Sequence, residues 1–502
     1  MKRNAFIRTL LSLLMILMIF LSPAGAFAEV ASSIVSQDAT IEYLKSILDW
    51  IEDKYNGEVD LEQLIEGALS GMFEKMDDYT VFYTPEEADT FLQDVQGNYE
   101  GIGIMMSIRD GYITVVKVFS DSPAQRAGLV IGDRIVTVGD RSVFGSSLDI
   151  AAALIKGEAG TKVELGIIKN GQSNTISIEV ERASVKYNPV NYEIRGEIGY
   201  IQLDMFNSNT YEFVDKALGE MDAKGIDKII MDLRGNPGGT VDQAVMVAQR
   251  FVPEGSITKL AFKSNSMPDI EYVSELKELK YELVILVNSM TASASEILAG
   301  AVQDTESGIV IGTKTFGKSK VQNILPILAP SAYEKYEEQL GEKIIDAYDL
   351  IRNHGIVPRD EEVVGWTKIT TGEYLTPLGR VIDGVGIIPD IKVEDPILVM
   401  DISISSVQEL QKTVKPELGS EGIDVLNAEK ILRLLGFTID APDMILDDKT
   451  FEAIAKYQEK RGLYPYGVLD FTTQQKLNED LEELMRTIDK QYGKAVEYLS
   501  NL

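Results

Sequence analysis

Two segments near the middle of the chain contain residues that could act as a nucleophile and its base. The first, residues 288–297, carries three serines: Ser289, Ser293 and Ser295. An apolar strand-like run precedes it and a helix-like pattern follows, which predicts a strand-to-helix turn. A helix N-terminus favours developing negative charge, so a serine at this turn is well placed for attack. Ser293 followed by Glu296 is also an ordinary capping box, a role that requires no catalysis.

The second segment carries three lysines: Lys314, Lys318 and Lys320. A lysine acts as a general base only when neutral, so its pKa must fall from about 10.4 toward 7. That fall corresponds to about 4 kcal/mol, which burial away from water can supply. For Lys318, the flanking Phe316 and Val321 are predicted to form the apolar walls. The alternative interpretation is a basic turn at the surface.

Composition narrows the choice of base. The chain has no cysteine and a single histidine, His354. These counts exclude a thiolate nucleophile, a zinc-thiolate site and a cluster of histidine ligands. His354 lies in a polar stretch and is predicted to be a surface residue. A nucleophilic enzyme of this composition is therefore expected to use another base, and no metal or organic cofactor is implied.

Gln322 follows Lys318 by four positions. Both a helix and a strand place positions i and i+4 on the same side. The amide oxygen of Gln322 could therefore orient the lysine amine without adding a charge.

The spacing of these groups resembles the C-terminal processing, or tail-specific, serine protease family. The matching motifs are Ser-Ala-Ser-Glu-Ile at 293–297, Phe-Gly-Lys at 316–318 and Val-Gln at 321–322. The resemblance implies Ser293 as nucleophile, Lys318 as general base and Gln322 as the third member of a Ser-Lys-Gln triad. The family usually has small residues where this chain has Ser319 and Lys320. This second cation is expected either to lower the pKa of Lys318 further or to point to solvent.

A glycine-rich segment, residues 232–239, follows another predicted strand and resembles the glycine loop of the same family. Acyl transfer needs hydrogen-bond donors for the oxyanion, and we assign them to the N–H groups of Gly238 and Ala294. The segment is not a phosphate loop, because no Lys-Ser/Thr pair follows the glycines. The alternative is a tight turn without catalytic function.

Residues 97–182 show short strands separated by turns. Ser-Pro-Ala-Gln-Arg-Ala-Gly-Leu at 122–129 and Gly-Asp-Arg-Ile at 132–135 resemble the PDZ domain of bacterial proteases. Four residues fall where that fold binds a peptide carboxylate: Gly101, Ile102, Gly103 and Ile104. Consecutive N–H groups can bind a terminal carboxylate, and the adjacent strand edge can pair with the peptide. The alternative is a plain glycine turn.

The remaining patterns predict a multidomain α+β protein. Residues 29–96 read as helices, and residues 183–400 alternate strands and helices as in an α/β core, which the resemblance makes crotonase-like. A charged, mostly helical insertion is expected at 329–365. Residues 415–480 resemble a small helical peptidoglycan-binding domain, with an unrelated helical appendage as the alternative, and residues 481–502 read as a helical tail. An internal repeat, Leu-Asp-x-x-Thr at 446–450 and 469–473, predicts that Asp447 and Asp470 each cap a helix.

The first 28 residues have the pattern of a secretory signal peptide. A positive start is followed by an apolar run and by Ala26-Phe27-Ala28 as a cleavage site. An uncleaved membrane anchor is the alternative. The formal net charge of −31 argues against nucleic acid or an anionic membrane as the main partner. We therefore expect an exported protein of the cell envelope or cell wall.

The predicted function is that of an exported serine endopeptidase that recognises polypeptide C-termini through the PDZ domain and cleaves through an acyl-enzyme. The resemblance also allows a homodimer formed through the N-terminal helices, and the C-terminal domain suggests peptidoglycan as a further partner. The alternative from another class is a non-catalytic adaptor that binds peptide tails and peptidoglycan. That alternative leaves the spacing of Ser293, Lys318 and Gln322 as coincidence.

Overall fold

The computed structural model describes residues 37–502, apart from 110, 120–121, 131, 170–173, 265–266, 397–398 and 403. The predicted signal segment, residues 1–28, lies outside the described residues. The chain divides into two compact units, Met1–Leu69 and Ser70–Leu502. Helix α2 (Gln37–Lys54) lies in the first unit, and α3 (Leu61–Glu74) crosses into the second. None of the helices described is both long enough and apolar enough to cross a bilayer.

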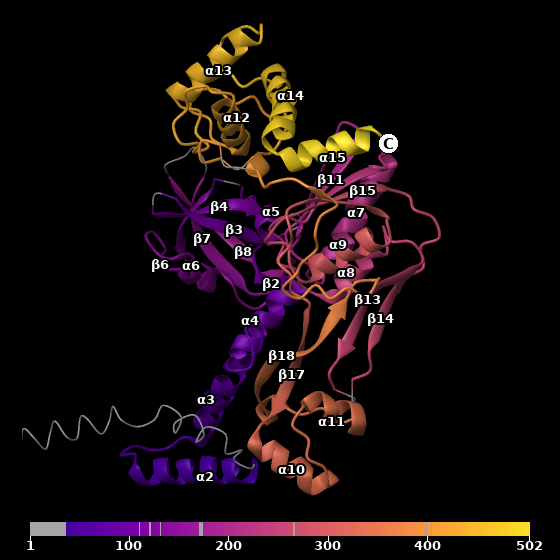
Figure 1. Ribbon diagram of the computed structural model, residues 1–502. Helices are drawn as coiled ribbons and strands as arrows, with labels where there is room; N and C mark the ends of the chain where they lie inside the picture. Colours follow the sequence, from indigo (N-terminus) through magenta and orange to yellow (C-terminus); the bar gives the residue numbers. More distant parts are fainter. Residues whose placement is uncertain are drawn as a thin grey trace, which may run out of the picture. The chain divides into compact units, whose positions relative to one another are not determined.

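A six-stranded sheet in the second unit positions the loops that carry the predicted chemistry (Figure 1). Its order is β10 (Val190–Arg195), β11 (Ile198–Leu203), β12 (Lys228–Asp232), β15 (Glu282–Val287), β16 (Gly308–Gly312) and β19 (Ile391–Lys392). All neighbours are parallel except β10 and β11. Since β12 and β15 are parallel neighbours, the glycine loop after one and the serine turn after the other emerge at the same edge.

Both faces of this sheet are buried, which explains why its strands read as nearly continuous apolar runs. One face packs against α7 (Thr210–Ala223), α8 (Val241–Ala248) and α9 (Ala294–Asp304), which belong to the same hydrophobic cluster as the sheet. Residues of the opposite face, including Ile230 and Leu286, share a second cluster with Val496 and Leu499 of α15 (Lys490–Ser500). The C-terminal region therefore shares a core with the six-stranded sheet.

A second, five-stranded sheet carries Lys320 and Gln322. It contains β1 (Val81–Tyr83), β18 (Val363–Leu375), β13 (Gly255–Phe262) and β14 (Ile270–Ser274) in that order, with β17 (Lys320–Leu328) paired to β18. Helices α10 (Pro330–Leu340) and α11 (Ala347–His354) lie between β17 and β18 and have a small core of their own. The predicted insertion at 329–365 is thus a helical extension of a long hairpin.

The region predicted to be a PDZ domain is an antiparallel sheet whose terminal strands are β3 and β8. The strand order is β3 (Ile104–Arg109), β4 (Tyr112–Val118), β5 (Arg134–Val138), β7 (Lys162–Ile168) and β8 (Thr175–Glu181), with β6 (Arg141–Ser142) paired to β5. Helix α6 (Leu148–Ile155) packs near β3. Outside this sheet, β2 (Asn98–Gly101), which follows α4 (Pro85–Gln96), pairs with β9 (Ala183–Lys186).

The C-terminal region is helical, as predicted, with α12 (Ile423–Leu434), α13 (Asp448–Lys460) and α14 (Phe471–Ile488) before α15. The aspartates of the internal repeat, Asp447 and Asp470, cap α13 and α14 by accepting the N–H groups three residues on, each at 2.8 Å. The predicted boundary at 480–481 falls inside α14, because Leu477, Leu481 and Met485 continue one buried stripe.

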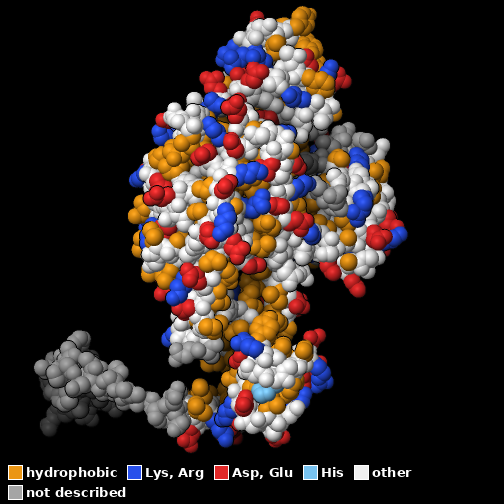
Figure 2. All heavy atoms as spheres, turned by 90° about the vertical axis from the view of Figure 1, so that its right-hand side faces the viewer, with side chains coloured by type: hydrophobic (Ala, Val, Ile, Leu, Met, Phe, Trp, Pro, Cys, Tyr) orange, Lys and Arg blue, Asp and Glu red, His pale blue; other side chains and the backbone are white. Residues whose placement is uncertain are grey.

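On the face shown in Figure 2, charged side chains of both signs are spread over the surface rather than gathered in one patch. Acidic and basic side chains are interspersed there with apolar ones.

The shared core predicts that α15 stabilises the six-stranded sheet. Leu499 is fully buried, and Leu499→Ala should lower the free energy of unfolding by about 2–5 kcal/mol, the usual range for a buried leucine. Leu502→Ala is the matched control, because Leu502 is 62% exposed. Urea unfolding followed by tryptophan fluorescence measures the difference. Equal stability of the two variants would contradict the shared core.

Candidate active site

Ser293 occupies the turn between β15 and α9 in a strained backbone conformation. Its φ is 56° and its ψ is −121°. A positive φ of this kind costs a residue other than glycine about 1–3 kcal/mol. The residue is the N-cap of α9, and the predicted capping box with Glu296 is present. A strained strand-to-helix turn is also the arrangement that presents the nucleophile in α/β-hydrolases, so a capping role and a nucleophilic role are compatible for the half-buried Ser293.

The glycine loop packs directly against Ser293. Gly238 has a φ of +100°, and a Cβ on it would lie 2.7 Å from the carbonyl oxygen of Ala292 and 2.7 Å from Cβ of Ser293. Both the conformation and the close approach therefore require glycine.

The two predicted oxyanion donors differ in their present hydrogen bonding. The N–H of Gly238 donates to Oδ1 of Asn236 at 2.9 Å. The N–H of Ala294, in the first turn of α9, has no acceptor within the part of the chain that the structure describes. Gly238 must therefore exchange the Asn236 side chain for an oxyanion before it can serve as a donor.

Lys318 is half-buried, and its amine lies against an aromatic ring. Nζ is 4.4 Å from the centroid of Tyr79. Burial lowers the pKa of Lys318 below its usual value, and the positive charge of Lys368 lowers it further, while Asp77 and Glu296 act in the opposite direction. The direction is the one that a general base requires.

The surroundings of Lys318 correct two sequence-based predictions. Phe316 was predicted to be a wall, but its side chain is 55% exposed, and the ring on the amine belongs to Tyr79. Lys320 neither depresses the pKa of Lys318 nor points freely to solvent. It pairs with Asp383 at 3.2 Å and Glu373 at 3.6 Å.

A single buried carboxylate joins the serine turn to the lysine loop. Glu296 accepts the N–H of Ser293 at 2.9 Å, of Gly317 at 2.8 Å and of Lys318 at 2.9 Å, together with the hydroxyl of Thr315. Burial raises the pKa of this carboxyl, although its four hydrogen bonds act in the opposite direction. Glu296 thus fixes the backbone of both predicted catalytic residues at once.

Tyr374 makes a second connection between the same two residues. Its hydroxyl lies 2.9 Å from the carbonyl oxygen of Ser293 and 2.6 Å from that of Lys318. The side chain is buried and comes from β18. Sequence reasoning assigned no role to Tyr374, Tyr79 or Lys368, which lie far from both motifs along the chain.

Ser293, Lys318 and Gln322 line one cavity of about 620 Å³, whose walls include apolar side chains of β13 and β14. The amide nitrogen of Gln322 donates to Oγ1 of Thr370 at 3.3 Å, next to a β-bulge in the β17–β18 pair. His354 lies at the end of α11, where it contacts Glu342 at 3.2 Å, and does not line this cavity. The three predicted residues are therefore brought together without a histidine.

The predicted peptide-binding loop lines a separate cavity of about 300 Å³. Gly101, Ile102, Gly103 and Ile104 form one side, and Ala152 and Ile155 of α6 contribute apolar surface. Among the residues described, no acceptor is present for the N–H groups of Ile102 and Gly103. Strand β3, which follows, is an edge strand. This geometry can accommodate an extended peptide and its terminal carboxylate.

The arrangement around Glu296 predicts a large effect of a small change. Glu296→Gln places an NH₂ group where the carboxylate accepts the N–H groups of Ser293 and Lys318. Each buried N–H left without an acceptor costs about 1–3 kcal/mol, so the free energy of unfolding should fall by about 2–6 kcal/mol. Thermal unfolding measures this, with the exposed Glu282→Gln on β15 as control. A change no larger than that of the control would contradict the role of Glu296.

Four known domains match successive parts of the chain. Residues 197–393 match peptidase family S41, residues 101–180 the PDZ domain, and residues 421–477 a putative peptidoglycan binding domain. Residues 24–88 match the N-terminal domain of the activating protease CtpB. The S41 match contains every residue placed above around Ser293 and Lys318 except Asp77 and Tyr79.

Relatives match along most of the chain. The carboxy-terminal processing protease CtpA of Bacillus subtilis (strain 168) is 31% identical over 92% of this chain and 91% of its own length. The carboxy-terminal-processing protease of Bartonella bacilliformis is 30% identical over 74% of this chain and 82% of its own. CtpB of B. subtilis is 28% identical over 89% and 86%, respectively. The chain is therefore a serine peptidase of family S41 and belongs to the carboxy-terminal processing proteases.

Proposed function

We propose that this peptidase is an exported endopeptidase that uses Ser293 as nucleophile and Lys318 as general base. The observation that carries the proposal is the joint placement of these residues. They line one cavity, their backbones share the Glu296 carboxylate and the Tyr374 hydroxyl, and the pKa of Lys318 is lowered by burial and by Lys368.

In the proposed reaction, neutral Lys318 accepts the hydroxyl proton of Ser293 as Oγ attacks the scissile carbonyl carbon. The tetrahedral intermediate collapses, the C–N bond breaks, and the Lys318 ammonium returns the proton to the leaving amine. A water molecule then attacks the acyl-enzyme while Lys318 accepts its proton. Cleavage of the ester restores the Ser293 hydroxyl and releases the new carboxyl terminus.

Three further groups complete the proposed site. Ala294 and Gly238 donate to the oxyanion through their N–H groups once Asn236 has released Gly238. Gln322 uses its amide nitrogen on Thr370, so its oxygen is the atom that would orient the Lys318 amine.

The PDZ domain binds peptide C-termini, and we propose that it does so through residues 101–104. The unpaired N–H groups there would hold the terminal carboxylate while the peptide pairs with β3. Cleavage in the core would then occur upstream of the captured tail.

The terminal regions of the chain support proposals for the location and assembly of the enzyme. The relatives and the peptidoglycan-binding-like domain indicate an extracytoplasmic role. We propose that residues 1–28 direct export and that the C-terminal domain holds the enzyme at the cell wall. We also propose a homodimer through the N-terminal helices, because Ile41, Leu44 and Trp50 of α2 are 55–66% exposed.

The dyad is tested by cleavage of an unfolded protein by wild type, Ser293→Ala and Lys318→Ala. We expect both substitutions to lower kcat/KM by a factor of at least about 10³, since each removes a group that reacts. Lys314→Ala, an exposed lysine in the same loop, is the control and should retain activity. Equal activity in all variants would remove the assignment. Inactivity of every protein, wild type included, would favour the alternative function, a non-catalytic adaptor that binds peptide tails and peptidoglycan.

The electrostatic part of the proposal is tested by Lys368→Met. The positive charge of Lys368 lowers the pKa of Lys318, so its removal should raise that pKa. Because the base must be neutral, the rising limb of kcat/KM against pH should move to higher pH. Activity at neutral pH should fall while the activity above the limb is unchanged. Lys314→Met is the control and should leave the limb in place. An unshifted limb in Lys368→Met would show that Lys368 does not act on the base.

A further inference from the structure

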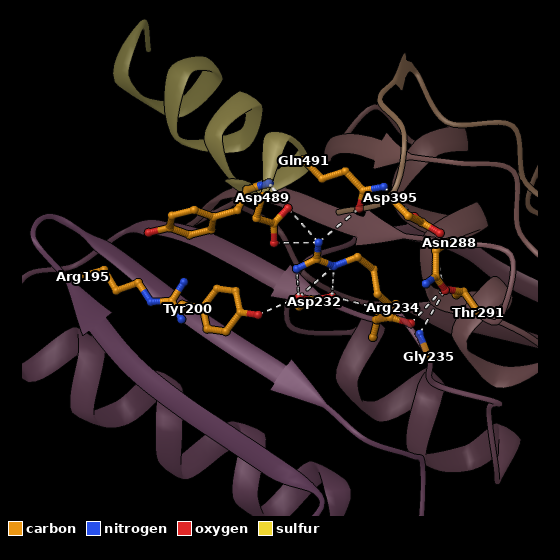
Figure 3. Close-up of polar contacts among 12 residues, drawn as sticks. Arg195, Tyr200, Asp232, Arg234, Gly235, Asn288, Thr291, Asp395, Asp489 and Gln491 are labelled. Carbon is orange, nitrogen blue, oxygen red and sulfur yellow. Dashed lines mark hydrogen bonds and ion pairs between the residues drawn. The ribbon is translucent and has the colours of Figure 1, made fainter. Parts of the chain in front are cut away.

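The glycine loop is held from outside the protease domain by the C-terminal helix α15 (Figure 3). Arg234, in the loop, donates from Nη1 to Oδ1 of Asp489 at 2.9 Å and to Oε1 of Gln491 at 3.3 Å. Asp489 is both the C-cap of α14 and the N-cap of α15. Asp489 therefore connects three parts of the chain: α14, α15 and the glycine loop.

The other side of Arg234 is fixed by the protease sheet. Nε donates to both carboxylate oxygens of Asp232, at 2.9 and 3.0 Å, and the hydroxyl of Tyr200 donates to the same carboxylate at 2.6 Å. The side chains of Arg234, Asp232 and Asp489 are 8%, 3% and 5% exposed. The guanidinium is thus clamped between two buried carboxylates, one from β12 and one from the C-terminal region.

The glycine loop on both sides of Arg234 is also hydrogen-bonded to the serine turn. Gly235 donates its N–H to Oδ1 of Asn288 at 3.0 Å, and the hydroxyl of Thr291 donates to the carbonyl of Leu233 at 2.8 Å. The N–H of Ala292 donates to the carbonyl of Asn236 at 3.1 Å. Residues on both sides of Arg234 are therefore bonded to the turn that carries Ser293.

A buried ion pair adds little net stability compared with apolar side chains of the same volume. The bonds of Arg234 instead fix the position of the glycine loop, because a guanidinium that is hydrogen-bonded on two sides restricts the movement of the backbone that carries it. Gln491 adds to this by donating to the carbonyl of Val393 at 3.0 Å and to Asp395 at 2.8 Å.

We propose that Asp489 and Gln491 are positioning residues for catalysis: through Arg234 they hold the glycine loop in register with Ser293. The C-terminal helix is then part of the catalytic unit and not only a cell-wall attachment. This inference rests on the proposed function, because it assigns the loop the task of binding the oxyanion. Oxyanion donors act mainly in the transition state, so loosening them lowers kcat more than it changes KM.

The decisive variant is Asp489→Asn in the full chain. Oδ1 of Asp489 also accepts the N–H of Tyr492 at 3.0 Å, and asparagine keeps this cap while it removes the charge that faces Arg234. Lys228→Met is the matched control: it removes the bond from Nζ to the carbonyl of Leu499 at 2.7 Å, which ties the other end of α15 to the sheet. Both changes weaken the docking of the helix, but only one touches Arg234.

We expect Asp489→Asn to lower kcat on a peptide substrate about 10-fold with KM within about 2-fold, and Lys228→Met to leave kcat unchanged. Hydrogen exchange followed by mass spectrometry should show faster exchange of the amides at 233–239 in Asp489→Asn than in Lys228→Met. Wild-type kcat and wild-type exchange in Asp489→Asn would overturn the inference. An equal loss of kcat in the two variants would also overturn it, because helix docking alone would then explain the effect.

Failure of the proposed function would look different. If Ser293→Ala retained full activity, the assignment of the nucleophile would fall, whereas the exchange at 233–239 would still report whether Asp489 holds the loop. Gln491→Ala, with the same two readouts, tests the second residue: unchanged exchange and kcat would restrict the positioning role to Asp489.

Discussion

The site depends on one buried carboxylate. Glu296 accepts hydrogen bonds from the backbone of both Ser293 and Lys318, two residues that belong to different loops. Without this carboxylate, the serine turn and the lysine loop would be joined by the Tyr374 hydroxyl, by one backbone bond from Phe316 to Thr291 and by the sheets that carry them. Such a fixed backbone is what pre-organised catalysis requires, because misplacement by about 1 Å can cost two orders of magnitude in rate. One of these bonds is made by the N–H of Ser293 itself, the residue with the positive φ.

The electrostatics of Lys318 balance opposing effects. Burial and the charge of Lys368 favour the neutral amine, whereas Asp77 and Glu296 favour the ammonium. The ring of Tyr79 also favours the charged form, because its face attracts a cation. A base that must accept a proton and later return it benefits from stabilisation of both forms, so the ring and the burial serve different steps of the proposed reaction.

Local patterns in the sequence predicted much of this arrangement. The apolar run before Ser293 and the aspartate caps of the C-terminal repeat depend on neighbouring residues, and the structure contains them as predicted. Contacts across the fold could not be read in the same way. Tyr79 and Lys368 reach Lys318 from distant segments, and Phe316 is exposed because the loop turns its side chain outward. Continuous apolar strands likewise predict two buried faces without identifying α15 as the cover of one of them.

The proposed catalytic centre is a neutral amine that is sheltered from water and tied to a strained serine. The most direct test is NMR titration of Lys318 in ¹³C-lysine-labelled Ser293→Ala protein, because this variant is not expected to cleave itself during the titration. The Cε resonance, assigned by its loss in Lys318→Arg, should titrate with a pKa clearly below that of the exposed lysines. A pKa of Lys318 at or above that of the exposed lysines would mean that the amine is charged at physiological pH. This result would contradict the role of Lys318 as a neutral base.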